Sequence, residues 1–291
     1  MFDQMSRFVS RFRELEQQEY TQTREEERQW NQLKIKLAAP QAEEQHQSIS
    51  RKCIAVTSLY EQAGASFVAG NVAYSLASQG IPVTLCEMPG SASYYYFSLD
   101  FERRAKTSTN HSSTSVLLMQ DNYLRIQIKP PYLHHPTPQI DIADWLLRIN
   151  KESSVVVIDL SSSWREAEAT RILDFADEIW VIFDTDFARL TRLFLMESAP
   201  IWWNLTGPKM KWVANKWNDC LSRSGMKKKV EGTLSLWNTE ANSATIHAVL
   251  PQFDGEKISL AQAKGSLLLE RYPEEETYFH PLVNACKGRM L

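Results

Sequence analysis

Residues 52–89 constrain the fold most strongly, because two short apolar runs flank one helical pattern there. The runs cover residues 53–57 and 82–86. Between them, residues 66–79 place apolar side chains at close to 3.6-residue spacing, and Ser66 stands in the N-cap position of this helix. A buried parallel strand, a crossover helix and a second parallel strand have this pattern. The segment therefore predicts one βαβ unit.

Further apolar runs along the chain repeat this alternation. Strands are predicted over 124–128, 154–159, 178–184, 210–216 and 245–251, with helices over 140–149, 166–175 and 190–197. Strands that alternate with helices predict a doubly wound α/β domain, with a mainly parallel sheet and helices on both faces. We assign residues 49–291 to this domain and residues 1–48 to an N-terminal helical extension and linker.

Length and composition narrow the class of protein. A chain of 291 residues is long enough for one large α/β domain with an extension. Its formal net charge of −3 gives no general attraction to nucleic acid. The sequence shows no cleavable signal pattern and no apolar run long enough to span a bilayer, so we expect a cytoplasmic chain. Its four cysteines lack metal-ligand spacing, and Cys53 and Cys86 are expected to fill the core as small apolar side chains.

The N-terminal extension differs in composition from the domain. Residues 1–48 are rich in Glu, Gln and Arg and contain no Gly. Apolar side chains between Met1 and Leu15 fall at helical spacing, with arginines around them. Such a helix packs against the domain, pairs with a partner helix, or lies on an anionic membrane surface. Packing is our expectation, and membrane contact and disorder are the alternatives.

The loop after the first strand is the segment whose residues indicate whether the protein binds a nucleotide. Residues 58–67 read SLYEQAGASF, and a loop in this position is where P-loop proteins hold phosphates with glycines, backbone N–H groups and a lysine. The segment resembles the opening of the MinD/ParA family of P-loop ATPases, in which a lysine and two glycines lead into Gly-Lys-Thr-Thr. On that pattern, Gly64 and Ser66 keep the expected residue types.

The other loop positions depart from the family pattern. Tyr60 stands at the signature lysine, Glu61 and Gln62 at the paired glycines, Ala65 at the P-loop lysine and Phe67 at the second threonine. Without the two lysines, the phosphate charge has no fixed cationic partner. Glu and Gln in place of glycines also hinder close approach of the backbone. The resemblance therefore implies a retained scaffold without its phosphoryl-transfer chemistry.

Several strand-end residues match the same family. Asp159 stands where relatives have an Asp that contacts Mg²⁺ through water, and Asn215 stands where an Asn reads the adenine edge. Glu87 matches an acidic strand end, but Pro89 replaces an Asp that orients the attacking water. The resemblance thus implies a degenerate nucleotide site of Gly64, Ala65, Ser66, Phe67 and Asn215, and a vestigial Mg²⁺ site of Ser66 and Asp159. Helix capping by Ser66 and turn formation by the Asp and the Asn explain these residues equally well.

Other polar and aromatic segments favour structural interpretations. The aromatic run 94–97 is expected to pack rather than to stack on bases, because few basic residues lie near it. The lysines of 227–229 are expected in a solvated loop, and residues 101–115 in a polar, mobile insertion. The pair His134-His135 is not expected to bind metal, because no Cys or acidic residue stands nearby at ligand spacing.

The resemblance covers residues 52–291 and implies a MinD/ParA-like pseudo-ATPase. We expect it to act as a localisation or assembly scaffold without a cofactor, similar to the TadZ/CpaE proteins of Tad-type pilus machines. Residues 278–291 show no sustained helical stripe, so we expect no C-terminal membrane helix. Expected partners are proteins of a membrane-associated assembly and a second copy of the chain, at the inner face of the cell membrane. The alternative is a weak molecular switch that uses ATP and Mg²⁺ in positioning or DNA partition.

Overall fold

The structure is a computed structural model, and the part of the chain that it describes is residues 51–90, 94–104, 115–128, 130–131, 141–218, 223–237 and 244–287. The predicted N-terminal extension, residues 1–48, lies outside the described residues, and so does the pair His134-His135.

One sheet of eight strands runs through the domain, in the order β3-β4-β2-β5-β1-β6-β7-β8. The strands are β1 (Lys52–Ser58), β2 (Val83–Glu87), β3 (Ser115–Met119), β4 (Leu124–Ile128), β5 (Val155–Ser161), β6 (Glu178–Phe183), β7 (Met210–Trp217) and β8 (Ile246–Pro251). Every neighbouring pair is parallel except β3 and β4. The mainly parallel sheet is therefore confirmed, and all seven predicted strands form.

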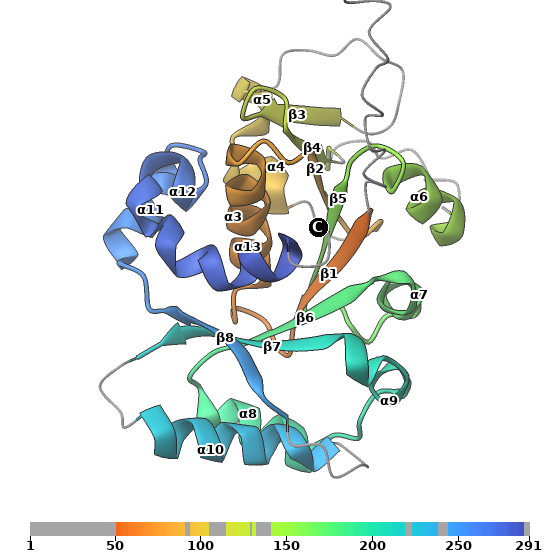
Figure 1. Ribbon diagram of the computed structural model, residues 1–291, viewed down its shortest axis with the longest axis vertical. Coiled ribbons are helices and arrows are strands. Elements are labelled where there is room, and N and C mark those ends of the chain that lie inside the picture. The colour runs from red at the N-terminus through yellow and green to blue at the C-terminus, as the bar shows by residue number, and fades with distance from the viewer. Residues whose placement is uncertain are drawn as a thin grey trace, which may run out of the picture. The chain divides into compact units, whose positions relative to one another are not determined.

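Helices cover both faces of this sheet (Figure 1). The first face carries α3 (Ala65–Ser78), α4 (Tyr94–Ser98), α5 (Phe101–Arg104), α11 (Gly255–Ala263), α12 (Leu268–Arg271), η3 (Pro273–Phe279) and α13 (His280–Lys287). The second face carries α6 (Ile142–Ile149), α7 (Ala167–Phe175), α8 (Phe187–Met196), α9 (Ile201–Thr206), η1 (Gly207–Lys209), α10 (Arg223–Leu234) and η2 (Ser235–Trp237). Each face has its own apolar core, because central strands bury side chains in both directions. The doubly wound architecture is confirmed.

Three segments differ in local structure from what the sequence suggested. The expected insertion of residues 101–115 contains α5 and the start of β3, although residues 105–114 lie outside the described part. The lysines of 227–229 lie on α10, where they are exposed on a helix rather than in a loop. The C-terminal stretch forms α13. Pro281 is compatible with this helix because it falls in the first turn, where the backbone N–H that proline lacks would have no intrahelical partner. Buried side chains of Leu282 and Cys286 then anchor this helix.

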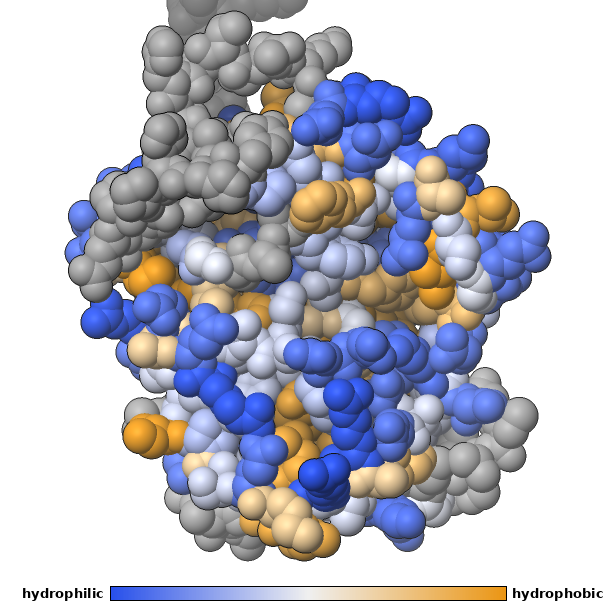
Figure 2. Space-filling view, turned by 180° about the vertical axis from the view of Figure 1, so that it is seen from behind, coloured by the Kyte–Doolittle hydropathy of each residue, from blue (hydrophilic) through white to orange (hydrophobic). Residues whose placement is uncertain are grey.

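None of the described helices has both the length and the apolar character needed to cross a bilayer. Figure 2 shows hydrophilic residues over much of one face, with hydrophobic residues in smaller groups among them.

Candidate functional site

The segment of residues 59–64, here the β1–α3 loop, joins the central strand to the first helix. It lies at the carboxyl edge of β1, whose two neighbours in the sheet are β5 and β6. The helix that follows β1 covers one face of the sheet, and the helix that follows β5 covers the other. Ligands of open α/β sheets bind at such a switch point, so the loop is the first place to look for a site.

An indole and a guanidinium hold the first half of the loop. Trp164 donates its Nε1–H to the carbonyl oxygen of Leu59 at 3.2 Å, in a buried hydrogen bond. Arg189 donates from Nη1 to the carbonyl oxygen of Glu61 at 3.1 Å. The same guanidinium lies 4.7 Å from the centre of the Tyr60 ring, a cation–π distance. The loop backbone is thus fixed by the protein's own donors.

Two residues at the end of β7 hold the second half. Lys216 donates from Nζ to the carbonyl oxygen of Gln62 at 2.5 Å. Asn215 is buried and donates from Nδ2 to the carbonyl oxygen of Ala63 at 2.8 Å. The residue predicted to read an adenine edge therefore contacts the loop itself. Its Oδ1 has no hydrogen-bond partner among the described residues.

Gly64 ends the loop in a conformation that suits glycine. Its φ of 102° is left-handed, and a Cβ built there would lie 2.3 Å from Nδ2 of Asn215. The structure makes Gly64, not Ser66, the N-cap of α3, which corrects the prediction. Ser66 lies one position inside the helix, because the left-handed glycine lets the helix begin at Ala65. No side chain of the described residues caps this helix end.

Tyr60, at the signature-lysine position, is buried and uncharged. Its hydroxyl donates to Oδ1 of Asp184 at 2.8 Å. Burial, and then the hydrogen bond to Asp184, raise the pKa of the Tyr60 phenol well above its ordinary value. This side chain supplies no positive charge to the loop.

The predicted Mg²⁺ pair, Ser66 and Asp159, is brought together beside β5. Ser66 Oγ lies 3.2 Å from the Oγ of Ser161. Asp159 is 1% exposed, and its Oδ1 accepts the backbone N–H of Ser161 at 2.8 Å. Burial raises the pKa of the Asp159 carboxyl, and the nearby hydroxyls of Ser66 and Tyr95 oppose that rise. Oδ2 of Asp159 makes no hydrogen bond to a described residue.

The remaining acidic and aromatic candidates have structural roles. Glu87 accepts the backbone N–H of Tyr94 at 2.5 Å and that of Tyr95 at 3.3 Å, so it caps α4. Tyr95 and Tyr96 are buried, as the packing interpretation requires. No cluster of three or more His, Cys, Asp or Glu side chains suited to a metal occurs in the described part of the chain.

Phe67, which the sequence predicts in the degenerate nucleotide site, contacts a core. Its ring packs against Phe253 at 5.4 Å and Phe279 at 6.1 Å between ring centres, in the first-face core. This residue of the predicted site therefore has packing contacts.

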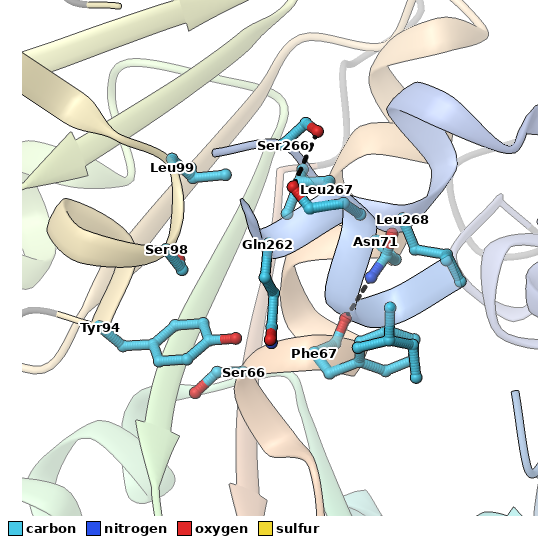
Figure 3. A pocket seen from close by; sticks show the side chains of 12 residues that line it. Ser66, Phe67, Asn71, Tyr94, Ser98, Leu99, Gln262, Ser266, Leu267 and Leu268 are labelled. Carbon is cyan, nitrogen blue, oxygen red and sulfur yellow. Dashed lines mark hydrogen bonds between the residues drawn. The ribbon is translucent and has the colours of Figure 1, made fainter. Parts of the chain in front are cut away.

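A small cavity lies beside Ser66, between α3, α4, α11 and the segment leading into α12. Figure 3 shows the hydroxyl of Tyr94 directed toward Ser66 and Gln262 at its wall. Its volume is about 20 Å³, room for about one water molecule, whereas ligand pockets usually measure about 300–1,000 Å³. This cavity therefore does not accept a nucleotide.

The sequence predicted Gly64, Ser66, Asp159 and Asn215 as site residues, but it did not predict Trp164 and Arg189, which bind the loop backbone. Trp164 and Arg189 carry no motif signal, since each donates to a backbone carbonyl from a segment distant in the chain. Their role is visible only once β5 and β6 lie next to β1.

No family model matches the chain, and no curated protein sequence matches it either. Solved structures do share its fold. The ParA family ATPase of Chlorobium tepidum superposes with a TM-score of 0.56 and 15% identity, over 81% of this chain and 98% of that one. A chain of the MinC:MinD cell division complex of Aquifex aeolicus superposes with a TM-score of 0.58 and 13% identity, over 81% of this chain and 96% of that one. MinD of Pyrococcus horikoshii complexed with Mg-ADP superposes with a TM-score of 0.57 and 12% identity, again over 81% of this chain and 96% of that one. Such low identities establish the fold alone. The chain has the fold of the MinD/ParA P-loop ATPases, as its loop and strand ends predicted.

Proposed function

We propose that this protein is a non-catalytic scaffold on the MinD/ParA fold, which positions or assembles a larger cellular structure. The observation that carries the proposal is the β1–α3 loop, whose carbonyl oxygens at four positions bind side chains of the same protein. A loop fixed in this way needs no phosphate to order it.

The residues at the family's two lysine positions, and Lys216, support the same conclusion. Phosphoryl transfer depends on cations that neutralise the phosphate oxygens. Ala65 has no charge, and the Tyr60 hydroxyl is bonded to Asp184. Nζ of Lys216 contacts Gln62 instead. The loop residues therefore do not fit a triphosphate, and we derive no catalytic step through one.

The oxygen donors fit a metal better than the loop fits a nucleotide. Mg²⁺ prefers carboxylate and hydroxyl oxygens, and Ser66 and Asp159 would hold it with water. Oδ2 of Asp159, which makes no hydrogen bond to a described residue, favours a second candidate function, the ATP-dependent switch. A helix N-terminus without a side-chain cap, as at α3, favours it as well.

Within the scaffold role, we assign the protein to a membrane-associated machine such as a Tad-type pilus. The support is the resemblance to TadZ/CpaE proteins in the core. One of the solved structures with this fold is a MinC:MinD complex, so in that case a protein of this fold binds a protein partner. From this resemblance and this complex, we propose that the chain binds protein partners and a second copy of itself at the inner face of the cell membrane.

Radiolabelled ATP with Mg²⁺ tests the two functions against each other. We expect no saturable Mg²⁺-dependent binding and no hydrolysis above buffer. Tight binding with hydrolysis that Asp159→Asn abolishes would establish the switch and refute the scaffold. Asp174→Asn is the matched control, because Asp174 is an exposed carboxylate on α7, outside the site.

A further inference from the structure

A hollow of about 440 Å³ opens on the second face of the sheet, next to the β1–α3 loop. We call it the arginine hollow, after the guanidiniums of Arg165, Arg189 and Arg192 in its wall. Tyr60, Leu193 and Met196 are among the other residues that line it. Its volume lies within the range of about 300–1,000 Å³ that is usual for binding pockets.

The charges of the arginine hollow are only partly compensated. Arg165 forms an ion pair with Glu197. Arg189 contacts a carbonyl oxygen and an aromatic ring but no carboxylate. Arg192 is exposed and makes no hydrogen bond or ion pair within the described residues. With Glu61 and Glu197 as the carboxylates in the lining, the hollow carries a net positive charge.

Apolar side chains accompany these charges. Leu193 is nearly buried within the hollow, whereas Met196 at the same wall is 79% exposed. A large apolar side chain this exposed, next to a guanidinium that has no partner among the described residues, is typical of a surface that binds a partner.

The shape of the surface distinguishes a protein partner from a membrane. A bilayer surface is flat and contacts protruding apolar side chains, so it does not fill a concave hollow. A peptide segment can place one side chain in the hollow and its neighbours on the rim.

We propose that the arginine hollow docks a partner segment in which an apolar side chain is flanked by acidic residues. The apolar side chain fills the space over Leu193 and Met196, and the carboxylates pair with Arg189 and Arg192. Guanidinium–carboxylate pairs of this kind are strong because they form two parallel hydrogen bonds. The inference gives the proposed scaffold a partner chemistry, but it holds whether or not the loop binds a nucleotide.

Selection from a random dodecapeptide phage library on the full-length protein tests the inference. We expect enriched peptides with an apolar residue between Asp or Glu residues. Fluorescence anisotropy of those peptides should show at least a tenfold loss of affinity for Arg192→Glu and a smaller loss for Arg192→Gln. Lys228→Glu on α10 is the matched control, because it reverses an equally exposed charge elsewhere and should bind like the wild type.

Two results would overturn this assignment. One is enriched peptides without acidic residues, or peptides that Arg192→Glu binds as tightly as the wild type does. The other is binding to phosphatidylglycerol vesicles that Arg192→Glu reduces, with no acidic peptide enriched, which would make the surface a lipid site. Met196→Asp tests the apolar contact of the proposed partner segment. This substitution, at an exposed position, should also weaken peptide binding. Circular dichroism melting confirms that each variant is folded.

Discussion

Gly64 is a residue of the loop where any added side chain would collide with Asn215. Its left-handed φ and the 2.3 Å gap from a hypothetical Cβ to Asn215 leave no room for another residue. The amide of Asn215 also holds the carbonyl of Ala63, so a shift of that amide breaks the hydrogen bond. The geometry of the loop therefore depends on one glycine and one asparagine.

Gly64→Ala should destabilise the protein more than Gly90→Ala does. Both glycines have left-handed φ values, 102° and 93°, so both variants incur backbone strain of about 1–3 kcal/mol. Only Gly64 would also place its Cβ against another described group, because no described residue lies within 4 Å of a Cβ at Gly90. Urea unfolding measures the two losses. Equal losses would show that the contact with Asn215 is relaxed in solution.

At the residue scale, the sequence predicted which residues lie near the loop, but not the contacts that their side chains make. The resemblance to the family implied a site that includes Ser66, Asp159 and Asn215. The structure brings these residues close to the loop, because the carboxyl ends of parallel strands share one edge. The orientation of side chains was beyond prediction. Phe67 faces a core that depends on Phe253, far along the chain, and no local pattern contains that contact.

At the scale of elements, a buried ionic cluster joins three strands and the last helix. Glu178 on β6 is 1% exposed and pairs with Lys52 of β1 at 2.9 Å and with Lys211 of β7 at 2.7 Å. Lys52 also donates to the carbonyl oxygens of Ala285 and Cys286, at 3.1 and 3.2 Å, near the C-terminal end of α13. A cation at this end of a helix is favoured by the helix dipole.

This cluster should make stability depend on pH below about 4.5. Burial by itself raises the pKa of Glu178, but hydrogen bonds from Lys211, Lys52 and Trp180 outweigh it and hold the pKa below its ordinary value. A carboxyl with a lowered folded-state pKa stabilises the fold above its unfolded pKa of about 4.3, and the contribution is lost as pH falls through the folded value.

Glu178→Gln isolates this contribution. At pH 7 the variant should lose about 3–5 kcal/mol, because it leaves the charge of Lys52 buried without its partner. The difference from the wild type should shrink as the pH falls from about 5 toward 3, because the wild-type carboxyl then becomes neutral too. Urea unfolding across this range measures it. A difference that stays constant with pH would contradict the assigned pKa direction.

Elements with a strong apolar period could be predicted, and those without one could not. The buried strands β1, β5 and β6 are continuous apolar runs, so their positions followed from the sequence. In α10, only Val230 and Leu234 are buried among the side chains that the structure describes, so the helix has no broad apolar stripe. The short strand β3 follows a polar stretch that hid its alternation.

At the scale of the whole molecule, charge argues against a DNA-partition role. The chain carries a net charge of −3, and Lys227 in its most basic run is paired with Glu231 at 3.7 Å. Duplex DNA should therefore show no binding that weakens with salt between about 50 and 200 mM. A steep fall in affinity over that range would instead indicate several phosphate contacts and support the partition alternative.

A crystal structure grown with ATP and Mg²⁺ tests the central claim most directly. The account predicts that the carbonyl oxygens of residues 59 and 61–63 keep their side-chain partners, with no triphosphate at the β1–α3 loop. A triphosphate bound against Gly64 and Ser66, with Asp159 beside the metal ion, would contradict it.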